Sequence, residues 1–243
     1  MSEQGHTKNL ENFKKEYHFA VSWGTKYAPT NSLLILRTML AQIAAGEAAM
    51  DAIITARTPY RNNVAAAQDA FLPLNELTTR IINAMKGAGI AASVIEDAKT
   101  YTRKIKGQRK TPKPKDDPNS PDFDESEKAH SAAQLSRTNR LENLEALLDL
   151  LGSQSLYNPN EDEINMTDLT AYLADLKAKT EAVQTSFVNL SNKYADRNAI
   201  FYDEETGIVA VGTLFKRYVE SFGRNSAEWN QVKGLRFKKI GRD

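Results

Sequence analysis

Two residue pairs in this sequence have a spacing that could serve a metal site, because each is a glutamate followed three residues later by a histidine. The pairs are Glu3 with His6 and Glu127 with His130. Di-iron bundles take such a pair from each of two helices and one further glutamate from each of two others. The first pair lies in a terminal segment and the second borders a proline-rich connector, which favours surface positions for both. We therefore predict no metal site and no cofactor.

Motifs of known enzyme classes are missing as well. The sequence contains no Gly-x-Ser-x-Gly elbow, no His-Glu-x-x-His zinc motif, no phosphate-binding loop and no dinucleotide fingerprint. Three histidines and no cysteine leave few groups for acid–base or nucleophilic catalysis. The acidic run at 116–127 lacks the central glycine of an EF-hand loop, so a solvated linker is the better interpretation. The sequence thus favours a protein that is not an enzyme.

Basic residues concentrate in two segments that could bind a polyanion. Residues 99–115 contain eight lysines and arginines, and residues 236–242 are also basic. Nucleic-acid binding needs such clustering together with groups that stack on the bases or read them. The formal net charge of +1 favours the alternative, a helix whose terminal cations interact with the helix dipole. The candidate contact residues in these segments are Arg103, Lys104, Lys106, Lys238 and Lys239.

Two further candidate interaction residues, Arg80 and Arg217, are matched when 77–85 is aligned with 214–222 at a shift of 137 residues. Because a guanidinium group binds carboxylates and phosphates through two parallel hydrogen bonds, an equivalent pair could hold an anion or the carboxylates of a partner. A structural salt bridge in each half of the chain is the alternative that we favour.

Short motifs support the internal repeat that this alignment implies. LENF at 10–13 and YAP at 27–29 recur as LENL at 141–144 and YNP at 157–159. The paired tyrosine and proline indicate a shared loop geometry and its packing before they indicate a binding site.

The repeat continues through two long stretches with helical periodicity. Apolar residues at alternating three- and four-residue spacing run from Met166 to Phe201, the heptad-like pattern of long helices and coiled coils. The same register occurs 130 residues earlier, from Leu36 to Phe71. We interpret this as a tandem repeat that contains two long helices. Pro59 should kink the first of them or divide it, since proline cannot donate a helical hydrogen bond.

Local signals place the shorter helices. Pro73 predicts the first turn of a helix that continues through 74–85. Ser93 and Glu96 have the spacing of a capping box and predict a helix over 94–106, and Ser226 is the predicted cap of one over 227–233.

These elements predict an all-α fold: an elongated antiparallel helical bundle with long central helices, built from two sequence-related halves about a pseudo-two-fold axis. The first helical repeat covers 1–106 and the second covers 128–243. Between them lies a flexible connector, 107–127, rich in proline and charge. We expect the halves to pack as one bundle, with two separate helical domains as the alternative.

The sequence also bears on location. Its first residues lack the apolar core of a signal peptide, and the alanine-rich stretch 38–56 is interrupted by Gln42, Glu47 and Asp51. With no cysteine in the chain, these features predict a cytoplasmic protein, although 38–56 is the one segment that a membrane-active hairpin could use.

Three phrases, LNELTTRIINAMKGAG at 74–89, DAKTYTRKIKG at 97–107 and RNAIFYDEETGIV at 197–209, resemble an uncharacterised family of internally duplicated, all-helical bacterial proteins with no known activity. The resemblance implies a bacterial protein and assigns no catalytic residue. We expect a non-enzymatic interaction or scaffold protein that binds another protein or a second copy of itself. The alternatives are a nucleic-acid-binding accessory protein that uses the basic segments and a membrane-active helical bundle.

Overall fold

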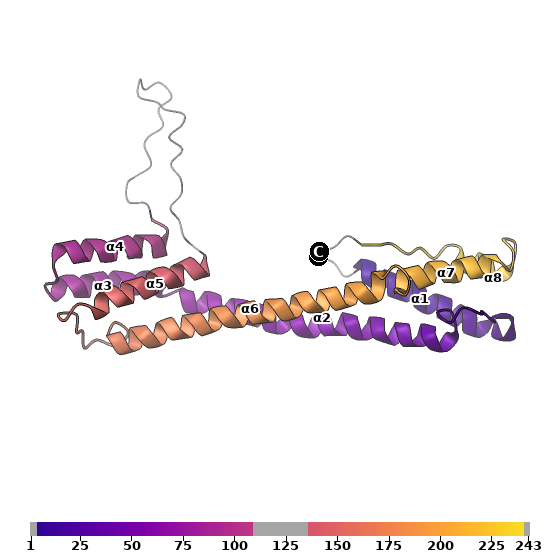
Figure 1. The fold of residues 1–243 in the computed structure, drawn as a ribbon, viewed down its shortest axis with the longest axis horizontal. Helices are drawn as coiled ribbons and strands as arrows, with labels where there is room; N and C mark the ends of the chain where they lie inside the picture. The colour runs from indigo at the N-terminus through magenta and orange to yellow at the C-terminus, as the bar shows by residue number, and fades with distance from the viewer. Residues whose placement is uncertain (1–3, 109–135, 241–243) are drawn as a thin grey trace, which may run out of the picture. The chain divides into compact units, whose positions relative to one another are not determined.

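The computed structural model describes residues 4–108 and 136–240, and in these two ranges the regular secondary structure is helical, without a strand (Figure 1). The all-α prediction is therefore confirmed. The predicted connector falls outside the described residues from position 109 onward, as do residues 128–135 of the second repeat. In chain order the elements are α1 (Gln4–Ser22), the 3₁₀ helix η1 (Gly24–Lys26), α2 (Leu36–Phe71), α3 (Leu74–Gly87), α4 (Ala92–Lys106), α5 (Arg137–Gly152), α6 (Met166–Tyr202), α7 (Ile208–Glu220) and α8 (Ala227–Val232).

The chain divides into two compact units, and neither is continuous in sequence. Unit 1 comprises Met1–Tyr60 and Ser186–Asp243, and unit 2 comprises Arg61–Thr185. Unit 1 therefore holds α1, α7, α8, the first part of α2 and the last part of α6. Unit 2 holds α3, α4 and α5 with the remaining parts of the two long helices. Each unit thus combines segments of both predicted repeats.

The two long helices occupy the ranges that the apolar register predicted, with 36 residues in α2 and 37 in α6. Pro59 lies inside α2 and does not divide it. The helix tolerates this proline because Pro59 and Thr55, whose carbonyl Pro59 cannot bond, are both exposed to solvent. The register of apolar residues therefore outweighs the proline.

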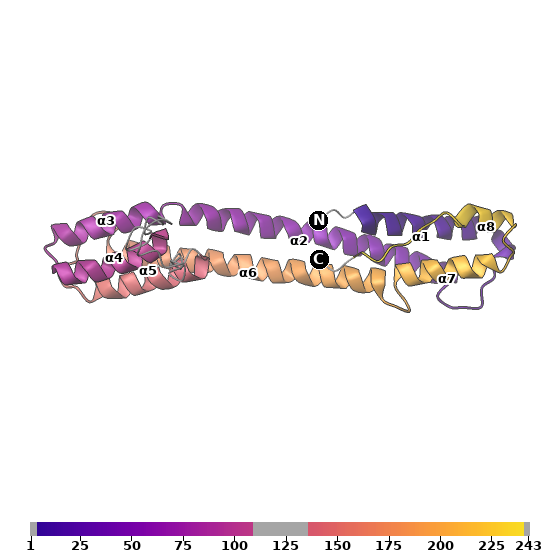
Figure 2. The same cartoon turned by 90° about the horizontal axis from the view of Figure 1, so that it is seen from above.

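Unit 2 is a small helical bundle in which α3, α4 and α5 lie side by side (Figures 1 and 2). Its core is aliphatic, and each buried leucine or isoleucine contributes about 1.5–3 kcal/mol relative to an exposed one. The fully buried side chains of this core come from all three helices and from α6: Leu74, Ile81, Met85, Ile105, Leu144, Leu147, Leu151, Leu169 and Leu176.

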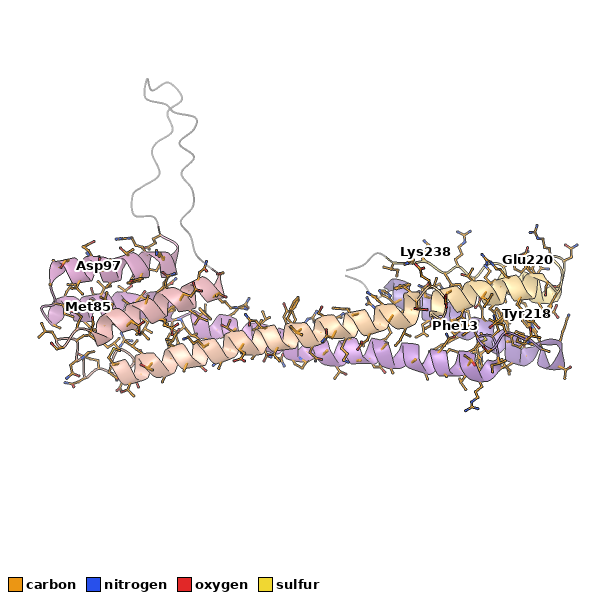
Figure 3. The ribbon with its side chains drawn as sticks, in the orientation of Figure 1. Phe13, Met85, Asp97, Tyr218, Glu220 and Lys238 are labelled. Carbon is orange, nitrogen blue, oxygen red and sulfur yellow. The ribbon has the colours of Figure 1, made fainter. Side chains whose placement is uncertain are left out.

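Unit 1 has a core that is aromatic to a greater extent. Phe13 of α1, Phe201 of α6 and Phe215 of α7 are fully buried, and Figure 3 shows Phe13 and Tyr218 in this unit. Around Phe215 the ring of Trp23 stacks at 5.9 Å between centroids, and that of Tyr27 lies at 5.6 Å. Aromatic pairs at such distances add roughly 0.5–1.5 kcal/mol beyond the area that they bury.

The two Tyr-x-Pro loops have the same structural role. Each tyrosine is buried and donates its hydroxyl hydrogen to a backbone carbonyl seven residues later: Tyr27 to Leu34 over 2.6 Å, and Tyr157 to Ile164 over 2.8 Å. Burial raises the pKa of Tyr157 to about 12, with Glu161 adding to the shift, and burial also raises the pKa of Tyr27. The interpretation of these motifs as loop-packing elements is confirmed.

The predicted caps have different outcomes. Ser226 caps α8 as predicted, because its hydroxyl accepts from the backbone N–H of Trp229 at 3.1 Å. The predicted capping box of Ser93 and Glu96 is wrong, since α4 begins at Ala92 and Ser93 already lies in its first turn. The extended backbone of Ala91 starts α4 directly, without a side-chain cap.

The burial patterns of α3 and α7 favour a different match from the one that paired Arg80 with Arg217. The buried faces of α3 and α7 coincide when Leu74 is matched to Ile208, instead of to Val211 as the sequence alignment had it. In that register Arg80 would be matched to Leu214, and the equivalence of the two arginines stays a prediction. The matched buried residues are Leu74, Leu77, Thr78, Ile81 and Met85 of α3, and Ile208, Val211, Gly212, Phe215 and Val219 of α7.

Candidate interaction site in unit 1

The C-terminal residues Leu235–Ile240, here called the C-terminal segment, follow α8 without regular secondary structure and bind to α1 through their backbone. Asn9 donates its side-chain N–H to the carbonyl of Lys238 over 2.8 Å and accepts the backbone N–H of the same residue over 3.1 Å. Asn12 donates to the carbonyl of Arg236 over 2.8 Å. Both asparagine side chains are buried. Two amides one helical turn apart therefore bind alternate residues of an extended chain.

The opposite side of the C-terminal segment is held by α7. Lys216 donates from Nζ to the carbonyl of Leu235 over 2.8 Å and to that of Lys233 over 3.2 Å. The ring of Phe237 fills the space above Gly212, where an added Cβ would lie 2.5 Å from its Cζ atom. A glycine is needed at position 212 because any side chain there would displace the ring. The segment thus lies in a groove between α1 and α7 with one aromatic anchor.

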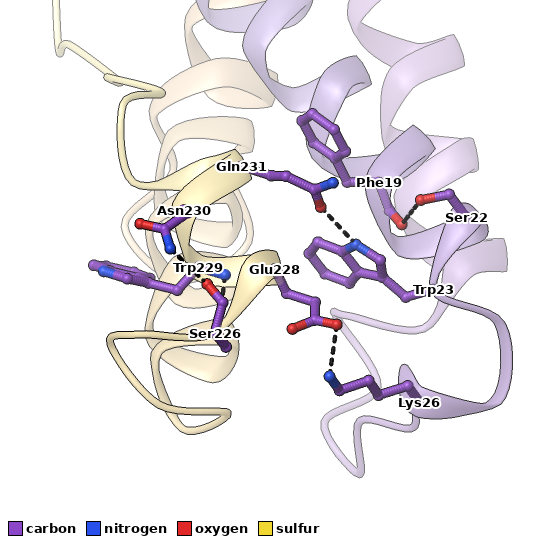
Figure 4. Close-up of polar contacts among 9 residues, drawn as sticks. All are labelled: Phe19, Ser22, Trp23, Lys26, Ser226, Glu228, Trp229, Asn230 and Gln231. Carbon is purple, nitrogen blue, oxygen red and sulfur yellow. Dashed lines mark hydrogen bonds and ion pairs between the residues drawn. The ribbon is translucent and has the colours of Figure 1, made fainter.

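Helix α8, which leads into this segment, is fixed to the end of α1 and to η1 (Figure 4). The indole N–H of Trp23 donates to Gln231 Oε1 over 2.9 Å, and Lys26 pairs with Glu228 at 2.6 Å. The hydrogen bond from Lys26 lowers the pKa of the Glu228 carboxyl. Together these contacts set where the C-terminal segment enters the groove.

Glu16 is an unusual residue at this place. It follows Asn9 and Asn12 on the same face of α1, is fully buried, and neither of its carboxylate oxygens has a hydrogen-bond partner among the described residues. Burial raises the pKa of Glu16 well above its usual range, and the positive charge of Lys216 opposes that shift only in part. A carboxylate without partners in such a place destabilises the fold, since it has lost its water and gained no bond.

A pocket of about 420 Å³ with a basic lining, here called the basic pocket, lies beside the C-terminal segment. Its charged groups are four cations and a single carboxylate, and two aromatic rings complete the walls. A flat anion would find charge neutralisation and stacking surfaces there. The residues that form it are Thr213, Lys216, Arg217, Glu220, Trp229, Leu235, Arg236, Phe237 and Lys238.

The structure brings three of the sequence-predicted candidates into this region. Arg217 and Lys238 line the basic pocket, and Arg217 also lines a second pocket of about 420 Å³ together with Lys239. Carboxylates dominate that second pocket, and Glu204 lies 3.9 Å from Lys239. Figure 3 shows Lys238 and Glu220 in unit 1. The cations available to a ligand are therefore those of the basic pocket.

The other predicted candidates belong to unit 2. Arg80 forms a salt bridge with Glu163 and lines a pocket of about 600 Å³ whose other charged groups, Glu76 and Asp168, are acidic. Arg103, Lys104 and Lys106 lie in the last turn of α4, where Lys106 donates to Thr79 Oγ1 over 2.5 Å. Cations there interact favourably with the helix C-terminus, which agrees with the structural interpretation of the first basic segment.

The residues that bind the C-terminal segment were not predicted from the sequence. A weak signal existed, because the motif pair LENF and LENL matches Asn12 to Asn143 and Glu16 to Leu147. Asn12 and Asn143 are both buried. Glu16 is a buried charged residue where the second motif has the core residue Leu147, and such a break in the apolar pattern is typical of a functional position. Which backbone the asparagines bind could not be read from the sequence, since their partners lie more than 200 residues away.

The possible metal pairs find no support as a site. Within 4–108 and 136–240 the structure contains no group of three or more histidine or carboxylate side chains placed to hold an ion. Glu3, Glu127 and His130 lie outside the described residues. His6 is a correction to the predicted surface tail, because it is buried in α1 with Nδ1 2.7 Å from the hydroxyl of Tyr202.

Comparisons with protein-family models, with curated protein sequences and with solved structures found no match to this chain. The resemblance to duplicated bacterial helical proteins stays a prediction.

Proposed function

We propose that this chain is a non-enzymatic interaction or scaffold protein, and that a protein partner binds the long helices in unit 1. The observation that carries the proposal is a thin seam between α2 and α6. Its buried part consists of Ile53, Ala56 and Leu190, flanked by two half-buried tyrosines. Close to it, Ile54, Phe187 and Val188 are 61%, 55% and 56% exposed.

Exposed apolar side chains of this size favour association, because covering them removes apolar surface from water. The composition of α2 points in the same direction. By length and composition alone the stretch Leu36–Gly87 could cross a membrane, with a mean hydropathy of 1.2 over its most apolar window, of which 33% is buried. Alanine-rich helices with little bulk also allow another helix to approach closely.

We further propose that the chain is an internal duplication that forms an antiparallel bundle about a pseudo-two-fold axis. The matching hydrogen bonds of Tyr27 and Tyr157 support this. The helices that make up each unit support the duplication too. If α1–α4 correspond to α5–α8 in order, exchanging the two repeats converts the elements of unit 1 into those of unit 2. A scaffold of this kind would present each type of surface twice.

An affinity experiment with surface variants tests the interaction role. Tagged protein is incubated with bacterial lysate, with and without nuclease, at low and moderate salt. We expect Ile54→Glu to lose a nuclease-insensitive protein partner that the parent retains, because a charge would have to be buried in the interface. Leu156→Glu is the matched control, since Leu156 is 60% exposed in a loop of unit 2. Equal capture by both variants and the parent would reject the α2 face as the binding surface.

The basic pocket favours one second function, the binding of a polyanion such as nucleic acid. Proteins bind single-stranded nucleic acid through cations and aromatic rings, and this pocket has four cations and two aromatic rings. Affinity for a labelled oligonucleotide should then fall steeply with salt, and Arg217→Ala should reduce the slope of log K against log salt by about 1. Release of a dye from liposomes would support the membrane alternative instead.

A further inference from the structure

We propose that the groove between α1 and α7 binds the C-terminal segment of a second copy of this chain, so that two copies exchange residues 235–240. This inference concerns a different surface from the exposed face of α2 and does not depend on it. It commits to one partner, a second copy, because the sequence that fits the groove is the chain's own.

The groove recognises its occupant chiefly through backbone atoms. Asn9, Asn12 and Lys216 bind three carbonyls and one N–H of the segment. Such bonds do not depend on which molecule supplies the chain, as in other complexes in which an extended peptide is held by main-chain hydrogen bonds. Selection for this particular sequence comes from the ring of Phe237 above Gly212 and from Ile240, whose side chain lies against Gly5.

The segment lies on the surface, and its residues Leu235 and Phe237 pack against the unit 1 core without being fully buried. All six of its residues are partly or fully exposed, with Leu235, Phe237 and Ile240 turned inward relative to the three basic residues. It joins α8 through Gly234, where an added Cβ would meet no described atom within 4 Å. A glycine in open space at the base of a short arm is a suitable hinge for exchange between identical chains.

The charges beneath the segment reduce the cost of opening. In the closed groove Lys216 donates to the carbonyl of Leu235 in the arm and to that of Lys233 before the hinge, and Glu16 has no hydrogen-bond partner in the described part of the chain. When the arm leaves, Lys216 loses its shorter bond, the one to Leu235, and can turn toward Glu16, on which its charge already acts. The carbonyls of the arm return to water at the same time. Part of the lost hydrogen bonding is therefore recovered within the opened groove.

Exchange between two copies would restore every contact of the closed groove. Each copy supplies one groove and one arm, so the pair is closed and symmetric. The exchanged state differs from the monomer in the hinge conformation and in the entropy of association, which makes it dependent on concentration.

Engineered cysteines test this cleanly, because the chain has none of its own. A Cβ at position 5 would lie 3.1 Å from Cγ1 of Ile240, and the Cβ of residue 240 is only one bond away from that atom. The two Cβ atoms are therefore near the separation of roughly 3.5–4.5 Å that a disulfide needs. Gly5→Cys and tagged Ile240→Cys proteins are concentrated together and oxidised. We expect a covalent heterodimer that joins position 5 of one chain to position 240 of the other.

Ser22→Cys replaces Gly5→Cys in the matched control. Ser22 is exposed at the far end of α1, roughly 25 Å along the helix from Gly5, so only random collision can link it to position 240. A heterodimer yield no greater than that of this control would overturn the proposal. So would an unchanged yield when Phe237→Ala is added to the tagged chain, since the arm would then not be bound in its groove.

A second measurement keeps the proposal testable if a single-cysteine variant folds poorly. The double variant Gly5→Cys/Ile240→Cys is oxidised while dilute, which locks each arm in its own groove, and its mass is measured by light scattering as it is concentrated. We expect the locked chain to stay monomeric and the reduced chain to form dimers.

The remaining outcomes each reject exchange. Dimers in both redox states would place self-association on another surface, such as the face that Ile54→Glu disrupts. A monomer in both states would reject self-association altogether. A reduced monomer that captures a lysate protein which the locked chain does not would assign the groove to a foreign peptide.

Discussion

Replacing Glu16 with leucine should stabilise unit 1. Glu16 is fully buried on α1, its carboxylate oxygens have no hydrogen-bond partner within the described ranges, and the nearest opposite charge, Lys216, is engaged with backbone carbonyls. Leucine occupies the corresponding position in the second LENF-like motif, where Leu147 is fully buried in the core of unit 2. The substitution therefore gives position 16 the residue that the second motif has at position 147.

The size of the effect follows from the cost of an unsatisfied polar group. Removing a buried group without a partner recovers about 1–3 kcal/mol in the free energy of unfolding. We expect a gain of about 2 kcal/mol at neutral pH. For a unit of this size that gain raises the melting temperature by roughly 8 °C, at roughly 4 °C per kcal/mol.

Tryptophan fluorescence is the assay of choice, because Trp23 and Trp229, the only two tryptophans of the sequence, both belong to unit 1. Urea unfolding followed by this signal reports on unit 1 alone. Glu11→Leu is the matched control, since Glu11 is exposed on the same helix and its replacement should change stability by less than about 0.5 kcal/mol.

The pH dependence gives an independent check. Burial raises the folded-state pKa of Glu16 above its usual value, so between these two values the folded chain keeps a proton that the unfolded chain has released. The stability that Glu16 contributes is thus fully present below its ordinary pKa, and it is lost as the pH rises toward the raised pKa. Glu16→Leu should remove this decline. A variant that is no more stable than the parent at neutral pH, with the same dependence on pH, would refute the reasoning.

Three further predictions follow from single contacts. Tyr27→Phe and Tyr157→Phe should each cost about 1 kcal/mol in urea unfolding, because each removes one buried hydrogen bond of the same type, and clearly unequal losses would argue against equivalent loops. Absorbance titration should show Tyr157 ionising near pH 12; its raised pKa means that the stability it contributes is present below about pH 10 and is lost as the pH rises toward 12, a loss that Tyr157→Phe should abolish. Gly212→Val should displace the ring of Phe237 and shift the emission of Trp229, which lines the same pocket, whereas the exposed Gly87→Ala should leave the emission unchanged.

The long helices could be predicted because their signal is periodic and local. Each apolar residue from Met166 to Phe201 identifies the same face as its neighbours three and four positions away, so a single proline in the related helix could not hide the pattern. The cap at Ser226 was equally local, since the hydroxyl binds an N–H three residues on. A capping motif alone did not suffice at Ser93, where the backbone of Ala91 had already begun the helix.

The groove and its occupant could not be predicted for the opposite reason. The bonds from Asn9 and Asn12 to the C-terminal segment join residues 229 and 224 positions apart, and side-chain amides that bind backbone atoms require no particular partner sequence. The match of Arg80 with Arg217 came from the sequence alignment, whereas the buried faces of α3 and α7, which the structure shows, favour a different match. The combination of helices from both halves of the sequence in each unit likewise has no local signature.

The division of each unit between both halves of the sequence bears on the order in which the protein folds during synthesis. When α1 leaves the ribosome, helix α7 and the C-terminal segment, which both pack against α1, have not yet been made. Asn9 therefore cannot form its hydrogen bond to Lys238 until much later. Unit 2 has its whole sequence available once Thr185 has emerged, whereas unit 1 also needs the later residues up to Ile240. Native contacts at such separations slow folding and leave early segments exposed. Helix α1 is therefore covered late, although it is translated well before its partners.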